Sequence, residues 1–109
     1  MNFQKTFLLG RATIDPNFGG DAEVPVVRFS VVTNRFYTDK RGNRNEESEL
    51  HNCVAFGKQA QFIKEHVKKS TLVFVEGRLN TRRWDGGHTT EIVVESIQLG
   101  GNVPEKVNN

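Results

Sequence analysis

Hydrophobic and polar positions alternate along much of the chain, which is the pattern of strands with one buried face. Between residues 24 and 37, the apolar side chains of Val27, Phe29 and Val31 are separated by polar ones. Because side chains two positions apart share a face of a strand, these three residues are predicted core residues. The same alternation predicts a half-buried strand over residues 24–37.

Two further β-prone segments flank this strand. Residues 3–14 are largely apolar and are interrupted by Gly10, where we expect a bulge or the close approach of another backbone. Residues 50–57 form the next predicted strand, with Leu50 and Phe56 on one of its faces.

Two segments lack a run of large apolar side chains, and we therefore predict that they are loops. Gly, Pro, Asp and Asn gather at residues 15–17 and 19–21, between the first two predicted strands. Residues 38–49 divide into a basic half and an acidic half, and we expect a long, mobile surface loop there. The simplest interpretation of this loop is a solvated hairpin tip, because most charge runs are solvated.

The period of the pattern changes after the third predicted strand. Within residues 58–69, Ala60, Ile63 and Val67 are spaced as on one face of a helix. This spacing predicts one short helix, with two lysines at its C-terminal end, where positive charge suits the helix dipole.

Residues 71–99 contain the clearest pattern in the chain. Two β-prone runs flank a Gly-rich break at residues 85–87, which predicts a β-hairpin. If no bulge intervenes, Arg78, Arg82 and Trp84 lie on one face of its first strand. Positive charges beside a large aromatic side chain are costly in a core and suit a flat, anionic ligand, so nucleic acid is the first candidate ligand.

Five strands with one helix between the third and the fourth describe an all-β protein with the layout of an OB-fold. This is a five-stranded Greek-key barrel used to bind oligonucleotides. A β-sandwich would show more and shorter strands, and a parallel α/β sheet would need more helices. With 109 residues the chain is long enough for one domain. We expect this domain to span residues 1–101, followed by a short flexible tail at 102–109.

Composition narrows the class of protein. The net charge is only +2, so a surface for nucleic acid must come from clustered charges. No apolar run is long enough to span a membrane, no secretory leader opens the chain, and the single Cys53 cannot form an internal disulfide. We therefore expect a soluble protein of the cytoplasm, associated with the nucleoid, without a membrane partner.

An enzyme is the rival class of function. His51 and Cys53 are the only plausible nucleophile pair, but positions i and i+2 of a strand lie about 6.5–7 Å apart, which is too far for the contact that catalysis needs. The histidines lack the close spacing of a zinc site, and no phosphate-cradling Gly motif is present. We expect neither enzymatic activity nor a metal or cofactor.

Six phrases, in this order and at these spacings, resemble the bacterial single-stranded DNA-binding protein (SSB) family over residues 1–101. They are LLGRATIDP, VVRFSVVTNRFYTDK, the run of Glu before His51, VAFGKQAQFI, VFVEGRLNTRRW and TTEIVVESIQLGG. The resemblance implies an OB-fold that assembles, usually as a homotetramer. It also implies wrapping of single-stranded DNA, without sequence preference, during replication, recombination and repair.

The resemblance assigns roles to individual residues. The base-stacking aromatic positions of the family fall on Tyr37, Phe56 and Trp84. A fourth aromatic position falls on Leu50, which is a departure from the family. His51 resembles a residue near the subunit contacts.

Other positions are assigned less directly. Basic residues that resemble those tracking DNA in the family are Lys40, Lys58, Lys69, Arg82 and Arg83. Further candidates for phosphate binding are Arg35, Arg41, Arg44 and Arg78. We expect the core or the subunit contacts to contain Phe3, Phe7, Phe29, Phe62 and Phe74, and Phe18 and Phe36 are left undecided. If Leu50 faces inward, the aromatic role of its position falls to Phe36 or Tyr37 instead.

The end of the chain departs from the family. Bacterial members commonly carry an acidic tail that recruits replication and repair proteins, but only NVPEKVNN follows Gly101 here. Recruitment of partners through a tail is therefore doubtful. The alternative function is an OB-fold accessory module of replication restart, or one that binds RNA.

Overall fold

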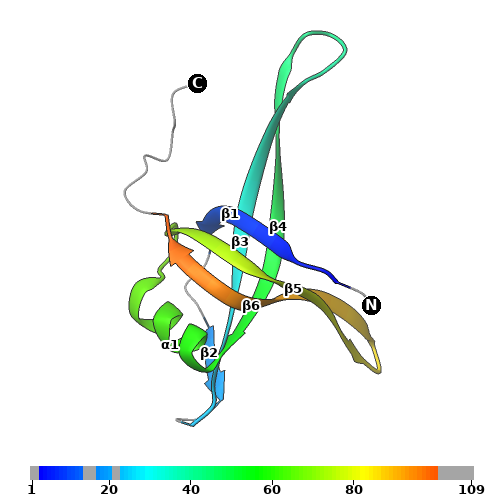
Figure 1. Cartoon of the computed structure of the whole chain (residues 1–109). Coiled ribbons are helices and arrows are strands. Elements are labelled where there is room, and N and C mark those ends of the chain that lie inside the picture. Colours follow the sequence, from blue (N-terminus) through cyan, green and yellow to red (C-terminus); the bar gives the residue numbers. More distant parts are fainter. Residues whose placement is uncertain (1–2, 14–16, 21–22, 101–109) are drawn as a thin grey trace.

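The computed structural model describes residues 3–13, 17–20 and 23–100 (Figure 1). Its elements are β1 (Thr6–Ala12), β2 (Asn17–Gly20), β3 (Pro25–Thr38), β4 (Arg44–Phe56), α1 (Gly57–His66), β5 (Leu72–Trp84) and β6 (Gly87–Leu99). The tail predicted at 102–109 lies outside the described residues.

Five of the strands close into a barrel. They follow the order β1-β5-β6-β4-β3, and β1 pairs with both β5 and β3, so the first and last strands of this order meet. All neighbours are antiparallel except β4 and β6, which pair in parallel. Together with α1 between β4 and β5, this arrangement confirms the predicted OB-fold.

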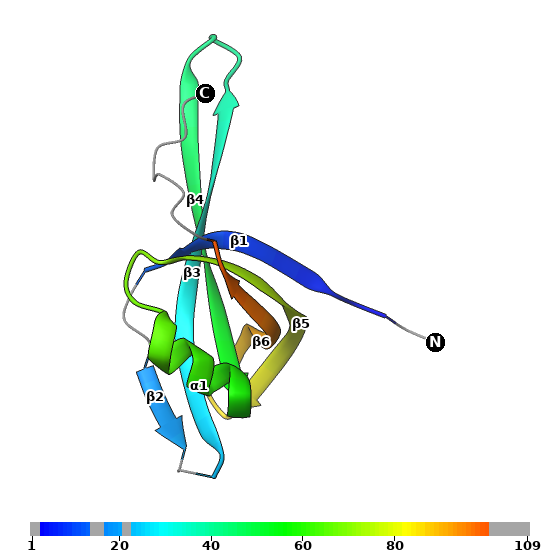
Figure 2. The same cartoon turned by 60° about the vertical axis from the view of Figure 1, so that its left-hand side comes forward.

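The barrel core consists of the inward-facing side chains of these strands. Val27, Phe29 and Val31 of β3 are buried, as their alternation predicts. α1 closes one end of the barrel with Ile63, which is fully buried in the same cluster (Figure 2). Burying a side chain of this size contributes roughly 1.5–3 kcal/mol to stability.

Two glycines allow strands to come close together. A β-carbon at Gly10 would collide with the carbonyl oxygen of Val32, so β1 meets β3 at the barrel seam only because this position has no side chain. The expected close approach at Gly10 is therefore confirmed. A β-carbon at Gly77 would likewise collide with the carbonyl oxygen of Val93, at the point where the register of β5 and β6 shifts between Glu76 and Gly77.

The predicted loop at 38–49 is wrong for residues 44–49, because β3 and β4 continue beyond the barrel as a two-stranded ribbon, whereas the hairpin tip expected there is confirmed at residues 39–43. We call residues 33–49 the arm; it projects from the barrel in Figures 1 and 2. The turn spans residues 39–43, where the Asp39 carboxylate accepts hydrogen bonds from the backbone N–H groups of Arg41 and Asn43. The bond from the Asn43 backbone, together with bonds from the Asn45 side chain and the Arg41 backbone, lowers the pKa of Asp39, since these bonds favour its charged form.

Other boundaries also differ from the predictions. Residues 17–20 form the edge strand β2, which pairs with the start of β3, although their turn-forming composition predicts a loop. The predicted loop residues Asp15, Pro16 and Asp21 lie outside the described residues. α1 ends at His66 rather than at residue 69, because Val67 already has extended dihedral angles. With ten residues, α1 is the one helix in the described ranges, and no helix there could cross a membrane.

Candidate nucleic-acid interface

The four predicted stacking positions all lie on the surface. Their exposed fractions are 51% for Trp84, 46% for Phe56, 40% for Tyr37 and 61% for Leu50. Trp84 ends β5, Phe56 ends β4, Tyr37 lies on the arm, and Leu50 lies where the arm joins the barrel. Burial in the core therefore does not account for any of the four.

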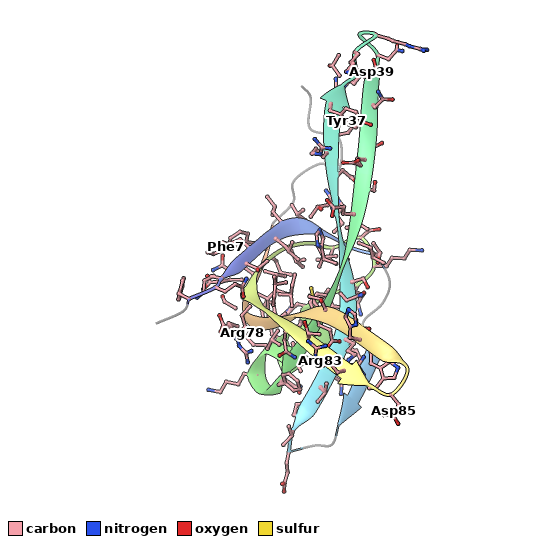
Figure 3. The ribbon with its side chains drawn as sticks, turned by 90° about the vertical axis from the view of Figure 1, so that its right-hand side faces the viewer. Phe7, Tyr37, Asp39, Arg78, Arg83 and Asp85 are labelled. Carbon is pink, nitrogen blue, oxygen red and sulfur yellow. The ribbon has the colours of Figure 1, made fainter. Side chains whose placement is uncertain are left out.

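The β5–β6 hairpin presents an aromatic side chain beside positive charge. The register shift at residues 76 and 77 precedes Arg78, so regular alternation places Arg78, Arg82 and Trp84 on one face, as predicted. The guanidinium carbon of Arg82 lies 5.5 Å from the centre of the Trp84 ring, within the range of a cation–π contact. Figure 3 shows the hairpin with Arg78, Arg83 and Asp85 labelled.

A buried carboxylate holds Arg82 from the neighbouring strand. Glu91 of β6 is only 5% exposed. One of its oxygens accepts a hydrogen bond from Arg28 Nε at 3.1 Å, and the other lies 3.6 Å from Arg82 Nε. A buried carboxylate needs such partners, because an unpaired buried charge is costly. Glu91 therefore links β3 to the hairpin strand that carries Trp84.

A cleft of about 260 Å³ lies at this ion-pair network. Its lining includes Arg82 and Glu91 from the hairpin and Ser30 and Asn52 from β3 and β4. Asn52 shares the strand face of Leu50 and Phe56, since the β3–β4 register is unbroken from Val26↔Phe56 outward. The cleft thus connects the face of β4 that carries two predicted stacking positions with the face of the hairpin that carries the third.

Tyr37 is on the opposite face of the ribbon from Leu50. The continuous register pairs Tyr37 with Asn45 and Val32 with Leu50, so the odd-numbered residues of the arm share one face and the even-numbered residues share the other. Arg35 lies on the face of Tyr37, with its guanidinium carbon 5.1 Å from the ring centre. The structure therefore does not bring all four predicted stacking positions onto one continuous face.

The predicted basic residues differ in their partners. Three are paired with carboxylates: Arg35 with Glu47 at 2.6 Å, Arg78 with Glu95 at 3.8 Å and Arg82 with Glu91 at 3.6 Å. Arg44 lies against the ring of Phe36. Lys69 is exposed just beyond α1. Within the described part of the chain, no ion pair involves Lys40, Arg41, Lys58 or Arg83, all of which are exposed.

His51 and Cys53 are not arranged as a base and its nucleophile. The His51 ring bonds Thr33 Oγ1 through Nε2 at 2.9 Å, and the Cys53 thiol donates to the backbone oxygen of His51 at 3.8 Å. Burial raises the pKa of Cys53 to about 12, so the thiol stays protonated near neutral pH. No cluster of potential metal-ligating side chains occurs among the residues that the structure describes.

Comparison with known families identifies the chain. Residues 3–100 match the model of the single-strand binding protein family, which is most of the 109 residues. The chain belongs to the single-strand binding protein family. The resemblance inferred from the six phrases is thereby confirmed.

Relatives in this family include named bacterial proteins. The chain is 38% identical over 104 residues to single-stranded DNA-binding protein 1 of Chlorobaculum tepidum, an alignment that covers 89% of this chain and 64% of that protein. It is 35% identical over 101 residues to the single-stranded DNA-binding protein of Bacillus cereus, with coverage of 87% and 58%. The chain thus spans less than two thirds of the length of these relatives.

Solved structures of single-strand binding proteins share the fold. A Plasmodium falciparum SSB in complex with ssDNA superposes with a TM-score of 0.78 at 27% identity, covering 91% of this chain and 96% of that chain. A deletion mutant of the Thermus aquaticus single-stranded DNA binding protein gives the same TM-score at 26% identity, covering 89% and 50%.

Sequence reasoning missed Glu91 at this surface and left Phe36 undecided. Glu91 is read from sequence as a polar strand residue, and only the barrel closure shows that it is buried between Arg28 and Arg82. The structure shows that Phe36 forms an aromatic–cation pair with Arg44. The turn sequence DKRGN, with an Asp that caps the turn and a Gly at φ +84°, could have indicated that the hairpin turn is short and that strands continue on both sides of it.

Proposed function

We propose that this chain binds single-stranded DNA without sequence preference, by stacking bases on exposed aromatic rings and pairing phosphates with basic side chains. The observation that carries this proposal is the half-exposed Trp84 with Arg82 against its ring, beside the cleft at Glu91. The ssDNA complex of the P. falciparum protein of the same fold supports it.

Stacking supplies affinity that does not depend on sequence. Each base stacked on an aromatic ring contributes roughly 1–3 kcal/mol, and every base has a π-face. In this proposal Trp84, Phe56 and Tyr37 stack bases, whereas Leu50 offers apolar contact without a π-face. Arg82 supports the Trp84 ring from the side and adds positive charge near a stacked base.

Basic side chains supply the part of the affinity that depends on salt. Binding of phosphates by Lys and Arg releases counterions from DNA. Lys58 and Arg83 lie close in sequence to Phe56 and Trp84, and Lys40 and Arg41 occupy the turn of the arm. These four residues are the strongest candidates, because they are exposed and have no ion pair in the described ranges. Arg44 and Lys69 are further candidates, while Arg35, Arg78 and Arg82 must share their charge with a carboxylate.

We further propose that the protein assembles as a homotetramer. Phe7, Leu9 and Phe74 form an exposed apolar strip on β1 and β5, in which the Phe7 and Phe74 rings stack at 6.0 Å. The position of Phe7 at this surface is visible in Figure 3. Exposed apolar clusters of this kind are typical of contact surfaces. In this proposal His51 lies near the subunit contacts, at the base of the arm.

Light scattering at micromolar concentration tests the assembly. Four copies of the 12.3 kDa chain are expected, and a mass near one copy contradicts it. The Leu9→Glu variant should lower the mass, because it places charge in the apolar strip. As a control, Leu79→Glu, which changes an exposed leucine on the β5–β6 hairpin, should leave the mass unchanged.

The proposed place of action is the nucleoid in the cytoplasm, where single strands arise during replication, recombination and repair. Recruitment of other proteins through an acidic tail forms no part of the proposal.

A competition experiment tests the choice of ligand. A fluorescent oligo-dT is bound to the protein, and unlabelled single-stranded DNA, RNA of the same sequence and duplex DNA are added in turn while anisotropy is recorded. Single-stranded DNA is expected to displace the label at the lowest concentration, and duplex DNA at the highest. Displacement by RNA at an equal or lower concentration contradicts the proposal and favours an RNA-binding module.

A further inference from the structure

Phe36 is an exposed aromatic side chain for which the fold provides no packing role. It lies on the arm, beyond the last pairing of β3 with the barrel at Val32, and 52% of its surface is exposed. It does not belong to the cluster of buried residues that forms the barrel core, which contains no residue of the arm. A two-stranded ribbon buries neither of its faces, so a phenylalanine on the arm adds little stability through burial.

Phe36 is paired with a cation on the adjacent strand. The guanidinium carbon of Arg44 lies 4.9 Å from the centre of its ring. This is the same combination of ring and guanidinium as at Arg82 and Trp84, and at Arg35 and Tyr37. Unlike those two arginines, Arg44 has no ion pair among the described residues, so its charge remains available to a phosphate.

The register of the ribbon places Phe36 on the face of Leu50. Leu50 pairs with Val32, and Phe36 follows Val32 by four residues along β3, so both side chains point to the same side. Four residues of a strand correspond to about 13 Å. The face that lacks an aromatic ring at Leu50 therefore has one about 13 Å further along the arm.

A hollow of about 270 Å³ accompanies this pair. It is lined by Phe36, Tyr37, Thr38 and Arg44, which carry two aromatic rings, two hydroxyls and one guanidinium. The register places the side chain of Tyr37, which is labelled on the arm in Figure 3, on the other face of the ribbon. An aromatic ring is thus available on each side of the arm near its tip.

We infer that Phe36, supported by Arg44, is an additional base-stacking site on the Leu50 face of the arm. A base stacks on the Phe36 ring, and Arg44 pairs with the adjoining phosphate. On this face, base stacking takes place at Phe36, further out along the arm, instead of at Leu50. This inference rests on the proposed function, since it concerns the same single-stranded DNA ligand.

A fluorescent reporter tests the contact directly. Trp84 is the only tryptophan, so the double variant Phe36→Trp/Trp84→Phe carries a single Trp on the arm. Poly-dT should quench this fluorescence, because an indole at position 36 stacks on a base. If the double variant binds labelled oligo-dT by anisotropy and its fluorescence is unchanged at saturation, the inference is overturned.

A pair of matched variants measures the contribution to affinity. Phe36→Leu keeps apolar contact and removes the π-face, and it should weaken binding to oligo-dT by about fivefold or more. Phe18→Leu removes an equally exposed ring from β2, at the opposite end of the molecule from the arm, and should leave affinity unchanged (Figure 1). Equal affinities of the two variants overturn the inference.

The fluorescent reporter and the matched variants together distinguish three cases: a binding role of Phe36, a structural role of Phe36, and failure of the proposed function. If Phe36→Leu weakens binding while the reporter at position 36 is not quenched, Phe36 only stiffens the ribbon, and the inference is overturned. If wild-type Trp84 is quenched by poly-dT and the arm reporter is not, the inference fails while the proposed function stands. If the wild type does not bind single-stranded DNA at all, the proposed function itself has failed.

Discussion

Arg82 places its guanidinium carbon 5.5 Å from the centre of the Trp84 ring, two residues further along the same strand face. The buried carboxylate of Glu91 lies 3.6 Å from the Nε atom of Arg82, so the cation beside the exposed ring is itself anchored in the barrel wall. An exposed aromatic side chain thereby has a fixed support, which lowers the entropy lost when a base stacks on it.

Replacing Glu91 by Gln should destabilise the fold. The change removes a buried negative charge that Arg28 and Arg82 both contact, and a hydrogen bond to a charged group contributes roughly 1.5–3 kcal/mol. Thermal melting at one fixed protein concentration measures the effect. The matched control is Glu95→Gln, which breaks exposed ion pairs with Lys5 and Arg78 and should cost at most about 1 kcal/mol. Equal losses in the two variants would mean that Glu91 is not a structural anchor.

Leu50→Trp should tighten binding to poly-dT. The side chain is 61% exposed and points outward, so a larger ring meets no core atoms and adds a π-face for one base. The gain should be at most the roughly 1–3 kcal/mol of one stacked base and should appear mainly as slower dissociation.

Leu79→Trp provides the control for Leu50→Trp. Leu79 is similarly exposed, but it pairs with Ile92 and so lies on the strand face opposite to Arg78. Affinity and melting temperature are measured on both variants. A Leu50→Trp protein that melts earlier and binds no better would remove Leu50 from the DNA-binding face.

Lys58 and Arg35 should differ in how they affect the salt dependence of binding. Loss of one phosphate contact to a single strand lowers the slope of log K against log salt concentration by about 0.7. Lys58→Ala should show this change, because Lys58 is exposed and has no ion pair in the described ranges. Arg35→Ala should change the slope less, because Glu47 already holds the guanidinium at 2.6 Å. A larger change for Arg35→Ala would contradict this ranking of the basic residues.

The barrel could be predicted from sequence because its strands bury one face. Val27, Phe29 and Val31 produce a period of two that no helix would give, and all three are buried. The Gly-rich break after Trp84 likewise predicted the β5–β6 hairpin, which carries this residue. The shared face of Arg78, Arg82 and Trp84 follows from the same alternation and is confirmed by the register, while their role in binding stays a prediction.

The arm could not be predicted in the same way, because a ribbon with two solvated faces has no hydrophobic period. Residues 44–49 read RNEESE, a composition typical of loops, yet they pair along their whole length with β3. Their strand structure comes from pairing with a β-prone partner and from the turn at Asp39. The pairs Arg35–Glu47 and Phe36–Arg44 depend on this register, so their contacts were not visible in the sequence.

The central claim is that Trp84 stacks on the bases of single-stranded DNA, and its fluorescence tests this directly. Trp84 is the only tryptophan, so titration with poly-dT reports on this one ring. We expect strong quenching, together with a loss of roughly 1–3 kcal/mol of binding free energy in Trp84→Ala at nearly unchanged melting temperature. Unchanged fluorescence when anisotropy shows the protein saturated with DNA would contradict the account, because the ring would then lie away from every bound base.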